Sequence, residues 1–201
     1  MFMIVMAKEP VPGRVKTRLC PPCDPQGAAD LAAAALADTL DAALDSGADE
    51  VVLALDGRPG DWCPDGVRIV PQCDGTFDRR LAHAWSTVGG PAVQIGMDTP
   101  QVTGALLDHA METLTSPGTD AVLGDAHDGG WWIIGLHSAD PAVFDGVPMS
   151  RPDTGALQRA RLAQLGLSVR DLPSLTDVDT FDDALAVAAL APTTRFAQVM
   201  A

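Results

Sequence analysis

Short apolar runs alternate with longer amphipathic segments along this chain, and this alternation constrains its fold more than any other feature. Seven short runs are predicted to be strands: residues 2–7, 50–55, 67–70, 91–97, 120–124, 131–136 and 167–172. Five longer segments are predicted to be helices: residues 27–46, 77–87, 103–115, 154–165 and 180–190. This alternation is typical of a three-layer α/β domain with a mostly parallel sheet. Because the runs at 120–124 and 131–136 leave no room for a crossover helix, antiparallel pairing is expected there.

Length and composition indicate one globular domain that binds neither nucleic acid nor membranes. With 201 residues, no internal repeat and no linker-like stretch, the chain is predicted to form a single domain over residues 1–201. Its 13 basic and 27 acidic residues give a formal net charge of −14, which opposes binding to nucleic acids and anionic membranes. No signal peptide or membrane span is recognisable, so a cytoplasmic location is expected.

The loop after the first predicted strand concentrates positive charge in an otherwise acidic chain. Residues 8–18 read KEPVPGRVKTR and contain four cationic side chains, namely Lys8, Arg14, Lys16 and Arg18. Prolines stiffen this loop, and Gly13 allows the backbone to turn close to a ligand. Because guanidinium groups bind phosphate in a bidentate manner and lysine adds a point charge, the loop suits a polyphosphate. The alternative is a loop whose cations pair with surface carboxylates.

Several common enzyme motifs are absent from the sequence. Neither G-x-x-x-x-G-K-[ST] nor G-x-G-x-x-G occurs, which disfavours a P-loop ATPase and an NAD-binding enzyme. There is also no serine or cysteine triad signature, so a hydrolase is not expected.

Aspartates follow the ends of several predicted strands. Asp98 comes directly after the strand at 91–97, Asp128 lies in the turn at 125–130, and Asp177 and Asp179 precede the last helix. Carboxylates that meet opposite a phosphate-binding loop would hold Mg²⁺ or Mn²⁺, which prefer oxygen ligands. Such a metal would neutralise phosphate charge and orient a leaving group. Each aspartate alone has a simpler explanation, since Thr180 or Asp179, for example, could cap the last helix.

Four motifs occur in order along the chain: KEPVPGRVKTRL (8–19), IGMDTP (95–100), DGGWWIIGL (128–136) and DVDTFDD (177–183). The resemblance that they carry runs from about residue 3 to 190, nearly the whole chain. Together they resemble a bacterial family of GT-A-type nucleotide-diphospho-sugar transferases, which is described as glycosyltransferase-like. That family is similar to 2-phospho-lactate guanylyltransferase and, more distantly, to molybdenum cofactor guanylyltransferase. The resemblance implies a Rossmann-like GT-A fold with a mixed, mostly parallel sheet. It also implies a nucleotide at the first loop and a divalent metal opposite.

The resemblance implies roles for individual residues. Nucleotide and phosphate binding is implied for Lys8, Gly13, Arg14, Lys16, Thr17, Arg18, Gln72 and Arg80. Metal binding is implied for Asp98 as the principal ligand, for Asp179 and, less directly, for Asp177. Lys16 and Asp98 are the residues expected to act in catalysis. The acceptor pocket is implied to involve Asp128, Gly129, Gly130 and Trp131, or Trp132 in place of Trp131.

One segment departs from the pattern of the family. Where the family resembles Q-G-x-G-D-L-G-E-R-[ML], this chain reads QCDGTFDRRL over residues 72–81. Gln72, Gly75 and Arg80 fit the pattern, but acids expected near Thr76 and Arg79 are missing. This departure leaves open the choice of nucleotide base and whether the protein is active.

Three functions are consistent with the sequence. The favoured one is a Mg²⁺-dependent nucleotidyltransferase that joins the NMP part of an NTP to a small phosphorylated or anionic acceptor and releases pyrophosphate. Four cations in one loop suit a triphosphate better than a diphosphate. The second is a glycosyltransferase that uses an NDP-sugar, and the third is a catalytically silent nucleotide-binding domain. The acceptor and the oligomeric state remain open, because one fold supports several chemistries.

Overall fold

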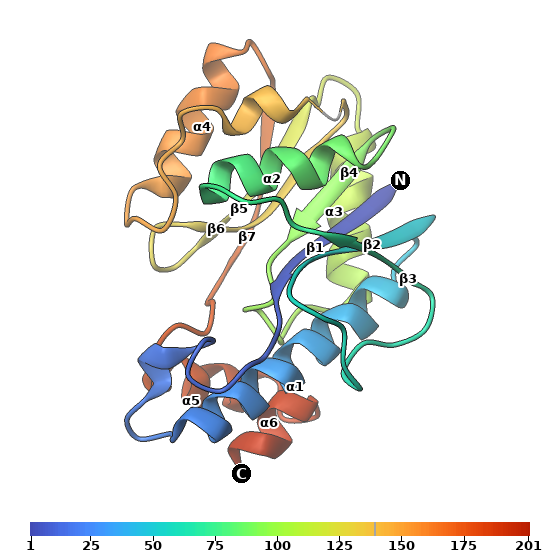
Figure 1. Ribbon diagram of the computed structural model, residues 1–201. Helices are drawn as coiled ribbons and strands as arrows, with labels where there is room; N and C mark the ends of the chain where they lie inside the picture. The colour runs from blue at the N-terminus through green and yellow to red at the C-terminus, as the bar shows by residue number, and fades with distance from the viewer. Residues whose placement is uncertain (139) are drawn as a thin grey trace.

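The computed structural model describes residues 1–138 and 140–201 (Figure 1). The strands are β1 (Phe2–Lys8), β2 (Glu50–Asp56), β3 (Val67–Pro71), β4 (Ala92–Ile95), β5 (Ala121–Ala126), β6 (Trp131–Leu136) and β7 (Val169–Leu175). The α-helices are α1 (Pro25–Leu44), α2 (Phe77–Ser86), α3 (Gly104–Thr115), α4 (Thr154–Gln164), α5 (Phe181–Leu190) and α6 (Arg195–Met200). Two short 3-10 helices are η1 (Thr17–Leu19) and η2 (Pro141–Phe144). No helix in these two ranges is long and apolar enough to span a membrane.

The strands form one mixed sheet in the order β3-β2-β1-β4-β6-β5-β7. Parallel pairing joins β1 to β2 and β4, β2 to β3, and β5 to β7. Strand β6 runs antiparallel to both β4 and β5, as the short connection before it predicts. The predicted α/β class with a mostly parallel sheet is therefore confirmed.

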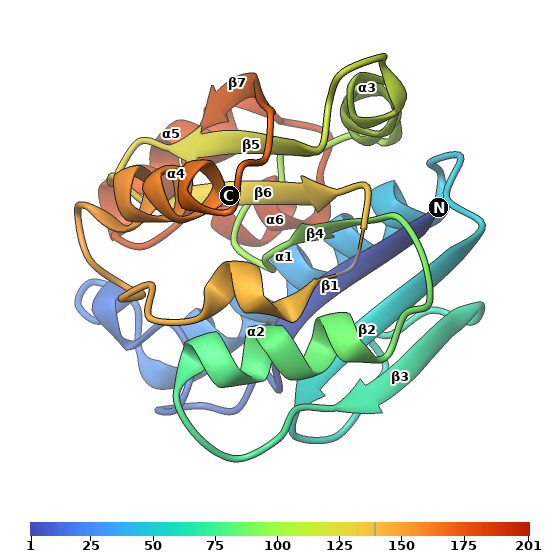
Figure 2. The same cartoon turned by 90° about the horizontal axis from the view of Figure 1, so that it is seen from above.

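Helices cover the two faces of the sheet (Figure 2), and one apolar layer lies on each face. Because side chains alternate along a strand, Met3 and Val5 of β1 pack with α1 and α3 on one face, and Ile4 and Met6 face α2, η2 and α4 on the other. Trp85 of α2 is fully buried in this second layer. The fold thus has three layers, with the sheet between two sets of helices.

A third apolar cluster lies at the end of the molecule where α1 begins, and it positions the candidate site. It joins Leu19 of the first loop to Leu31 of α1, Val178 before α5, and Phe196 of α6. Leu19 and Val178 are both buried, so the cationic loop and the segment around Asp177 and Asp179 are held by the same core.

The C-terminal helix α6 differs from the prediction, which placed no element after residue 190. Thr194 caps this six-residue helix by accepting a hydrogen bond from the Ala197 N–H at 3.1 Å. Arg195 forms ion pairs with Asp38 and Asp41 of α1. A helix of this length shows too few turns for a recognisable apolar period, so only its packing against α1 and α5 reveals it.

The beginning of α1 also differs slightly from the prediction. The helix starts at Pro25 instead of Gly27, because the Asp24 carboxylate accepts a hydrogen bond from the Gly27 N–H at 2.7 Å and Pro25 occupies the first turn.

Replacing Phe196 by alanine should destabilise the whole domain. Phe196 is 1% exposed, and removal of a buried aromatic ring lowers the free energy of unfolding by about 3 kcal/mol. Urea denaturation of the variant would measure this loss. Val199→Ala on the same helix is the control, because Val199 is 48% exposed and its loss should change stability by less than about 0.5 kcal/mol. Equal effects of the two substitutions would contradict the docking of α6.

Candidate functional site

The site lies at the carboxyl ends of the central strands, where three segments distant in sequence meet. The first loop follows β1, and Asp98 follows β4, its parallel neighbour. The connection between β7 and α5 joins them through a hydrogen bond from the Val178 N–H to the Asp98 carbonyl oxygen at 2.8 Å. Val178 is buried in the third apolar cluster. Because neighbouring side chains in an extended segment point to opposite sides, Asp177 and Asp179 face the cavity instead.

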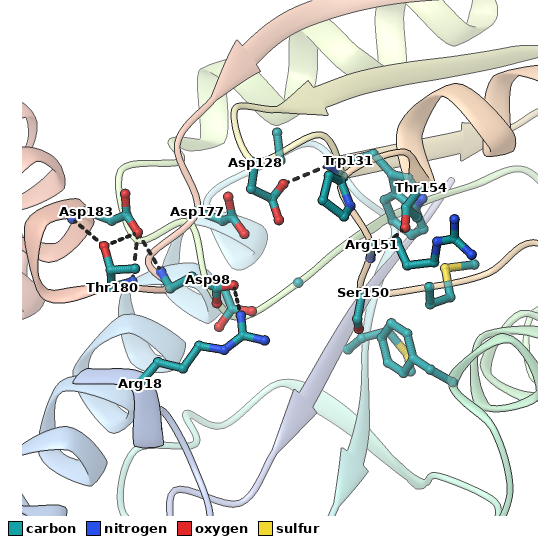
Figure 3. A pocket seen from close by; sticks show the side chains of 18 of the residues that line it. Arg18, Asp98, Asp128, Trp131, Ser150, Arg151, Thr154, Asp177, Thr180 and Asp183 are labelled. Atoms are coloured by element: carbon teal, nitrogen blue, oxygen red, sulfur yellow. Dashed lines mark hydrogen bonds and ion pairs between the residues drawn. The ribbon is translucent and has the colours of Figure 1, made fainter. Parts of the chain in front are cut away.

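Two cavities adjoin at this point, with volumes of about 650 Å³ and 250 Å³. They share three lining residues, Arg18, Asp98 and Asp179. The smaller cavity is lined by all four cationic side chains of the first loop. The larger cavity continues past the acidic residues toward Trp131 and the segment before α4 (Figure 3). Ligands that fill the two cavities would therefore meet at the same pair of carboxylates, Asp98 and Asp179.

Lys16 binds the two carboxylates that line both cavities, those of Asp98 and Asp179. Its ammonium lies 2.7 Å from Asp98 Oδ1 and 3.4 Å from Asp179 Oδ1, and it donates to the Val178 carbonyl oxygen. The side chain is only 10% exposed. Burial lowers the pKa of this ammonium, but Asp98 and Asp179 outweigh that effect and leave the pKa raised above its usual value. Lys16 is therefore a permanent positive charge between the acids.

The other cations of the loop differ in their partners. Arg18 pairs with Asp179, at 2.8 Å between NH1 and Oδ2. Lys8 and Arg14 form no ion pair with the described part of the chain and remain available to an anion in the smaller cavity. Gly13 has a φ of +74°, a conformation that glycine adopts without strain, and it lets the loop turn back toward this cavity.

Three carboxylates lie close together in the larger cavity. They belong to Asp128, Asp177 and Asp179. One oxygen of each lies within 4.8 Å of the other two. Burial and then the negative charge of Asp128 raise the pKa of Asp177 to about 6, and Asp179 and Asp98 add to this effect. A set of oxygen ligands that repel one another fits a divalent cation such as Mg²⁺ or Mn²⁺. Asp98, predicted as the principal ligand, lies beside this trio and pairs with Lys16.

The carboxylate of Asp179 is not used as a helix cap. Thr180 caps α5 through a capping box with Asp183, whose carboxylate accepts from the Thr180 N–H at 2.7 Å. Of the two predicted caps, Thr180 is therefore confirmed and Asp179 is wrong, and the Asp179 side chain contacts Lys16 and Arg18 instead.

The turn between β5 and β6 places Asp128 and Trp131 in the larger cavity. Asp128 Oδ1 accepts from the Gly130 N–H at 2.7 Å, which orients the carboxylate. Gly129 has a φ of +91°, and a Cβ there would clash with the carbonyl oxygen of Pro152. The turn therefore packs tightly against the start of α4. Trp132, the alternative wall, is buried, and its indole N–H donates to the Pro173 carbonyl oxygen at 2.9 Å.

Gln72 and Arg80 are placed outside the lining of both cavities. The Gln72 amide donates to the carbonyl oxygens of Ala7 and Ala54, each at 2.8 Å, and joins the ends of β1 and β2. Arg80 pairs with Asp56 at 3.0 Å. The structure thus brings together the cations and Thr17 of the first loop, whereas these two residues bind protein groups nearby.

Sequence reasoning missed part of the larger cavity. Its lining also includes Gln94, Ser150, Arg151 and Thr154. Gln94 lies within an apolar strand, Ser150 and Arg151 lie in the loop before α4, and Thr154 is the first residue of α4, so no recognisable motif marks them. Only the packing of the loop before α4 against the turn at 125–130 brings them to the site.

Comparison with known proteins places this geometry in a family. Residues 30–151 match DUF2064, described as an uncharacterized protein conserved in bacteria, and the chain belongs to this family. No curated protein matches the chain.

Three solved structures illustrate the fold. A candidate nucleotide-diphospho-sugar transferase from Desulfovibrio desulfuricans G20 is 24% identical, with 99% of this chain and 93% of that chain covered and a TM-score of 0.86. A nucleotidyl transferase from Methanothermobacter is 17% identical, with 96% of this chain and 99% of that chain covered and a TM-score of 0.66. The Rv0371c protein of Mycobacterium tuberculosis in complex with manganese is 25% identical, with 92% and 96% covered and a TM-score of 0.52. These likenesses confirm the GT-A-like transferase fold that the motifs predict.

Removing the charge of Asp177 should stabilise the protein in the absence of a divalent metal. At pH 7.5 its carboxylate is ionised in a half-buried place beside Asp128, so Asp177→Asn relieves repulsion. In EDTA the melting temperature should rise by about 2–4 °C, the shift that about 1 kcal/mol produces in a chain of this size.

Addition of MnCl₂ should then raise the melting temperature of the parent protein more than that of Asp177→Asn. Asp145→Asn is the control, because Asp145 is exposed and outside both cavities. A lower melting temperature for Asp177→Asn in EDTA would show that the carboxylate stabilises the fold and would contradict mutual repulsion.

Proposed function

We propose that this protein is a divalent-cation-dependent nucleotidyltransferase, which transfers the NMP part of an NTP to a small-molecule acceptor and releases pyrophosphate. The observation that carries the proposal is the meeting of two cavities at Asp98 and Asp179. One cavity is rich in cations and suits phosphates, and the other is large enough for a second substrate. The reaction joins two molecules, so a site with two adjoining compartments supports it.

The smaller cavity would hold the triphosphate. Lys8 and Arg14 are free to bind phosphate oxygens, and Arg18 and Lys16 add charge next to the carboxylates. Lys16 and Arg18 are held by Asp98 and Asp179 before a ligand arrives, which favours stabilisation of the charge that develops on the leaving pyrophosphate.

The acidic residues would hold the metal. Asp128, Asp177 and Asp179 provide the oxygen ligands, with Asp98 beside them, and a protein of the same fold is known in complex with manganese. A bound Mg²⁺ or Mn²⁺ would neutralise phosphate charge and orient the leaving group. Repulsion within this cluster supports the assignment, since a divalent cation would relieve it.

The chemical step would take place between the cavities. An oxygen of the acceptor bonds to the α-phosphorus, and the bond from that phosphorus to the oxygen that bridges to the β-phosphorus breaks. A hydroxyl that attacks gives its proton to solvent, and an ionised oxygen carries none. Pyrophosphate leaves with the bridging oxygen. This step needs positioning and charge neutralisation more than covalent participation of the protein.

A glycosyltransferase is the second candidate. The larger cavity has room for the sugar of an NDP-sugar beside the acids, and a candidate nucleotide-diphospho-sugar transferase has the same fold. The two candidates differ in the donor that they bind and in whether pyrophosphate is released.

A thermal-shift panel of four NTPs and several NDP-sugars, each with and without MnCl₂, would separate these functions. We expect one NTP to raise the melting temperature more with Mn²⁺ than without it, because a ligand specific to the folded state stabilises that state. Asp98→Ala should abolish the Mn²⁺-dependent part of this shift, whereas Asp145→Ala should retain it. Stabilisation by an NDP-sugar alone would contradict nucleotidyl transfer and favour the second candidate. If an NTP binds but no acceptor yields pyrophosphate, the protein is a silent nucleotide-binding domain.

Arg14→Ala should weaken NTP binding by about tenfold, since a hydrogen bond to a charged group contributes about 1.5 kcal/mol or more. Arg14 forms no ion pair with the described residues, so the substitution removes a cation without exposing an unpaired acid. Isothermal titration at two salt concentrations would also show a smaller salt dependence. Arg58→Ala is the matched control, because Arg58 is exposed and lines neither cavity. Unchanged affinity in Arg14→Ala would contradict the phosphate-binding loop.

A further inference from the structure

The larger cavity has two chemically different ends. Asp128 and Asp177 lie toward α5, whereas Ser150, Arg151 and Thr154 lie on the opposite side of the cavity (Figure 3). Asp179 also lines the cavity and directly precedes Thr180, the N-cap of α5. The first end is acidic. The second end is built around side chains that donate hydrogen bonds.

Gln94 contributes a fixed donor to this second end. The side chain is 1% exposed, and its Oε1 accepts a hydrogen bond from Trp85 Nε1 at 2.7 Å. An indole N–H can only donate, so the amide oxygen must face Trp85 and the amide nitrogen must face away from it. Among residues 1–138 and 140–201 this nitrogen has no hydrogen-bond partner, and Gln94 lines the cavity.

Trp131 contributes a second donor that lacks an acceptor. Its Nε1 is buried in the cavity wall without a partner in the described part of the chain. The ring packs against Phe144, with the ring centroids 6.5 Å apart, which holds the indole in place. A buried indole N–H without an acceptor is costly, and an oxygen of a ligand would satisfy it.

Arg151 brings a positive charge to the same end. Its Nε and NH2 bind the two carboxylate oxygens of Asp153 at 2.9 and 3.0 Å, which leaves NH1 without a partner among the described residues. The side chain is 56% exposed, and its backbone N–H donates to Thr154 Oγ1 at 3.1 Å. The guanidinium is thus oriented and still has donors for a ligand.

The remaining walls are apolar. Met6, Phe77 and Met149 also line this cavity. A ligand that fills it must therefore carry apolar surface as well as a group that accepts hydrogen bonds.

We propose that the larger cavity binds an acceptor substrate with an apolar body and an oxyanion, a carboxylate or a phosphate, that is recognised by Gln94, Trp131 and Arg151. The identification of this ligand as the acceptor rests on the proposed function. These groups hold the oxyanion at the end of the cavity opposite to the three aspartates, so the other end of the acceptor faces the metal and the α-phosphorus. An acceptor without an oxyanion would leave the NH1 group of Arg151 and the two fixed donors without an acceptor oxygen, so the site would discriminate against it.

Three small aromatic probes test this inference: phenyl phosphate, benzoate and benzyl alcohol. They share an apolar ring and differ in the attached group. By isothermal titration with MnCl₂ present, we expect at least one of the two anions to bind about tenfold or more tightly than benzyl alcohol. The tighter of the two anions identifies the group as carboxylate or phosphate.

Variants locate the bound anion. Arg151→Met should weaken its binding about tenfold, whereas Arg58→Met, the matched loss of a cation elsewhere, should not change it. Gln94→Glu keeps an oxygen toward Trp85 and replaces the cavity-facing nitrogen by a second oxygen, so it should also weaken binding. The melting temperature without ligand verifies that each variant is folded.

Three results would overturn the inference. Benzyl alcohol could bind as tightly as the anions, or Arg151→Met could leave their affinity unchanged. Alternatively, Arg14→Met could abolish anion binding while Arg151→Met does not, which would place the anion in the smaller cavity. A failure of the proposed function can be distinguished from a failure of this inference, because the thermal-shift panel of NTPs tests the proposed function independently. If an anion binds at Arg151 but no NTP binds to the protein, nucleotidyl transfer is refuted and the anion site is still supported.

Discussion

The ammonium of Lys16 is the charge around which the site is organised. It lies among Asp98, Asp179 and the carbonyl oxygen of Val178, and thereby joins the loop after β1, the end of β4 and the connection to α5. Without a cation at this place, carboxylates from two strand ends would face each other in a half-buried pocket. Such an arrangement persists only if positive charge compensates it. The cationic loop and the acidic cluster are therefore two parts of one electrostatic unit.

This unit depends on apolar packing behind it. Leu19, at the end of the first loop, and Val178, between the two aspartates, lie in the same buried cluster as Phe196. The cationic loop is thus anchored by the buried side chain of Leu19, and the segment with Asp177 and Asp179 is anchored by that of Val178. The same design holds Gln94 in place at the other end of the larger cavity, where Trp85 binds its amide oxygen. Preorganised polar groups of this kind bind charged ligands without the cost of ordering side chains.

The sequence predicts the regular elements of the fold better than it predicts the contacts of individual polar residues. The strands and most helices are predictable, since their apolar side chains repeat with the period of the element. Helix α6 is not, because it is short and is held by Phe196 and by the ion pairs of Arg195. Among the predicted nucleotide-binding residues, the cations of the first loop meet at one cavity. Gln72 and Arg80 instead bind backbone oxygens and Asp56, contacts that a motif cannot distinguish from ligand binding.

By itself, the sequence determined the α/β class, the concentration of cations in one loop and the placement of aspartates after strands. These properties follow from local patterns, and parallel strands bring their carboxyl ends to one edge of a sheet. Only the tertiary structure decided which groups face one another. It placed Asp128 with Asp177 and Asp179, paired Asp98 with Lys16, and brought Gln94 and Arg151 into one cavity. These contacts join segments far apart in the chain, so they depend on packing that no local pattern encodes.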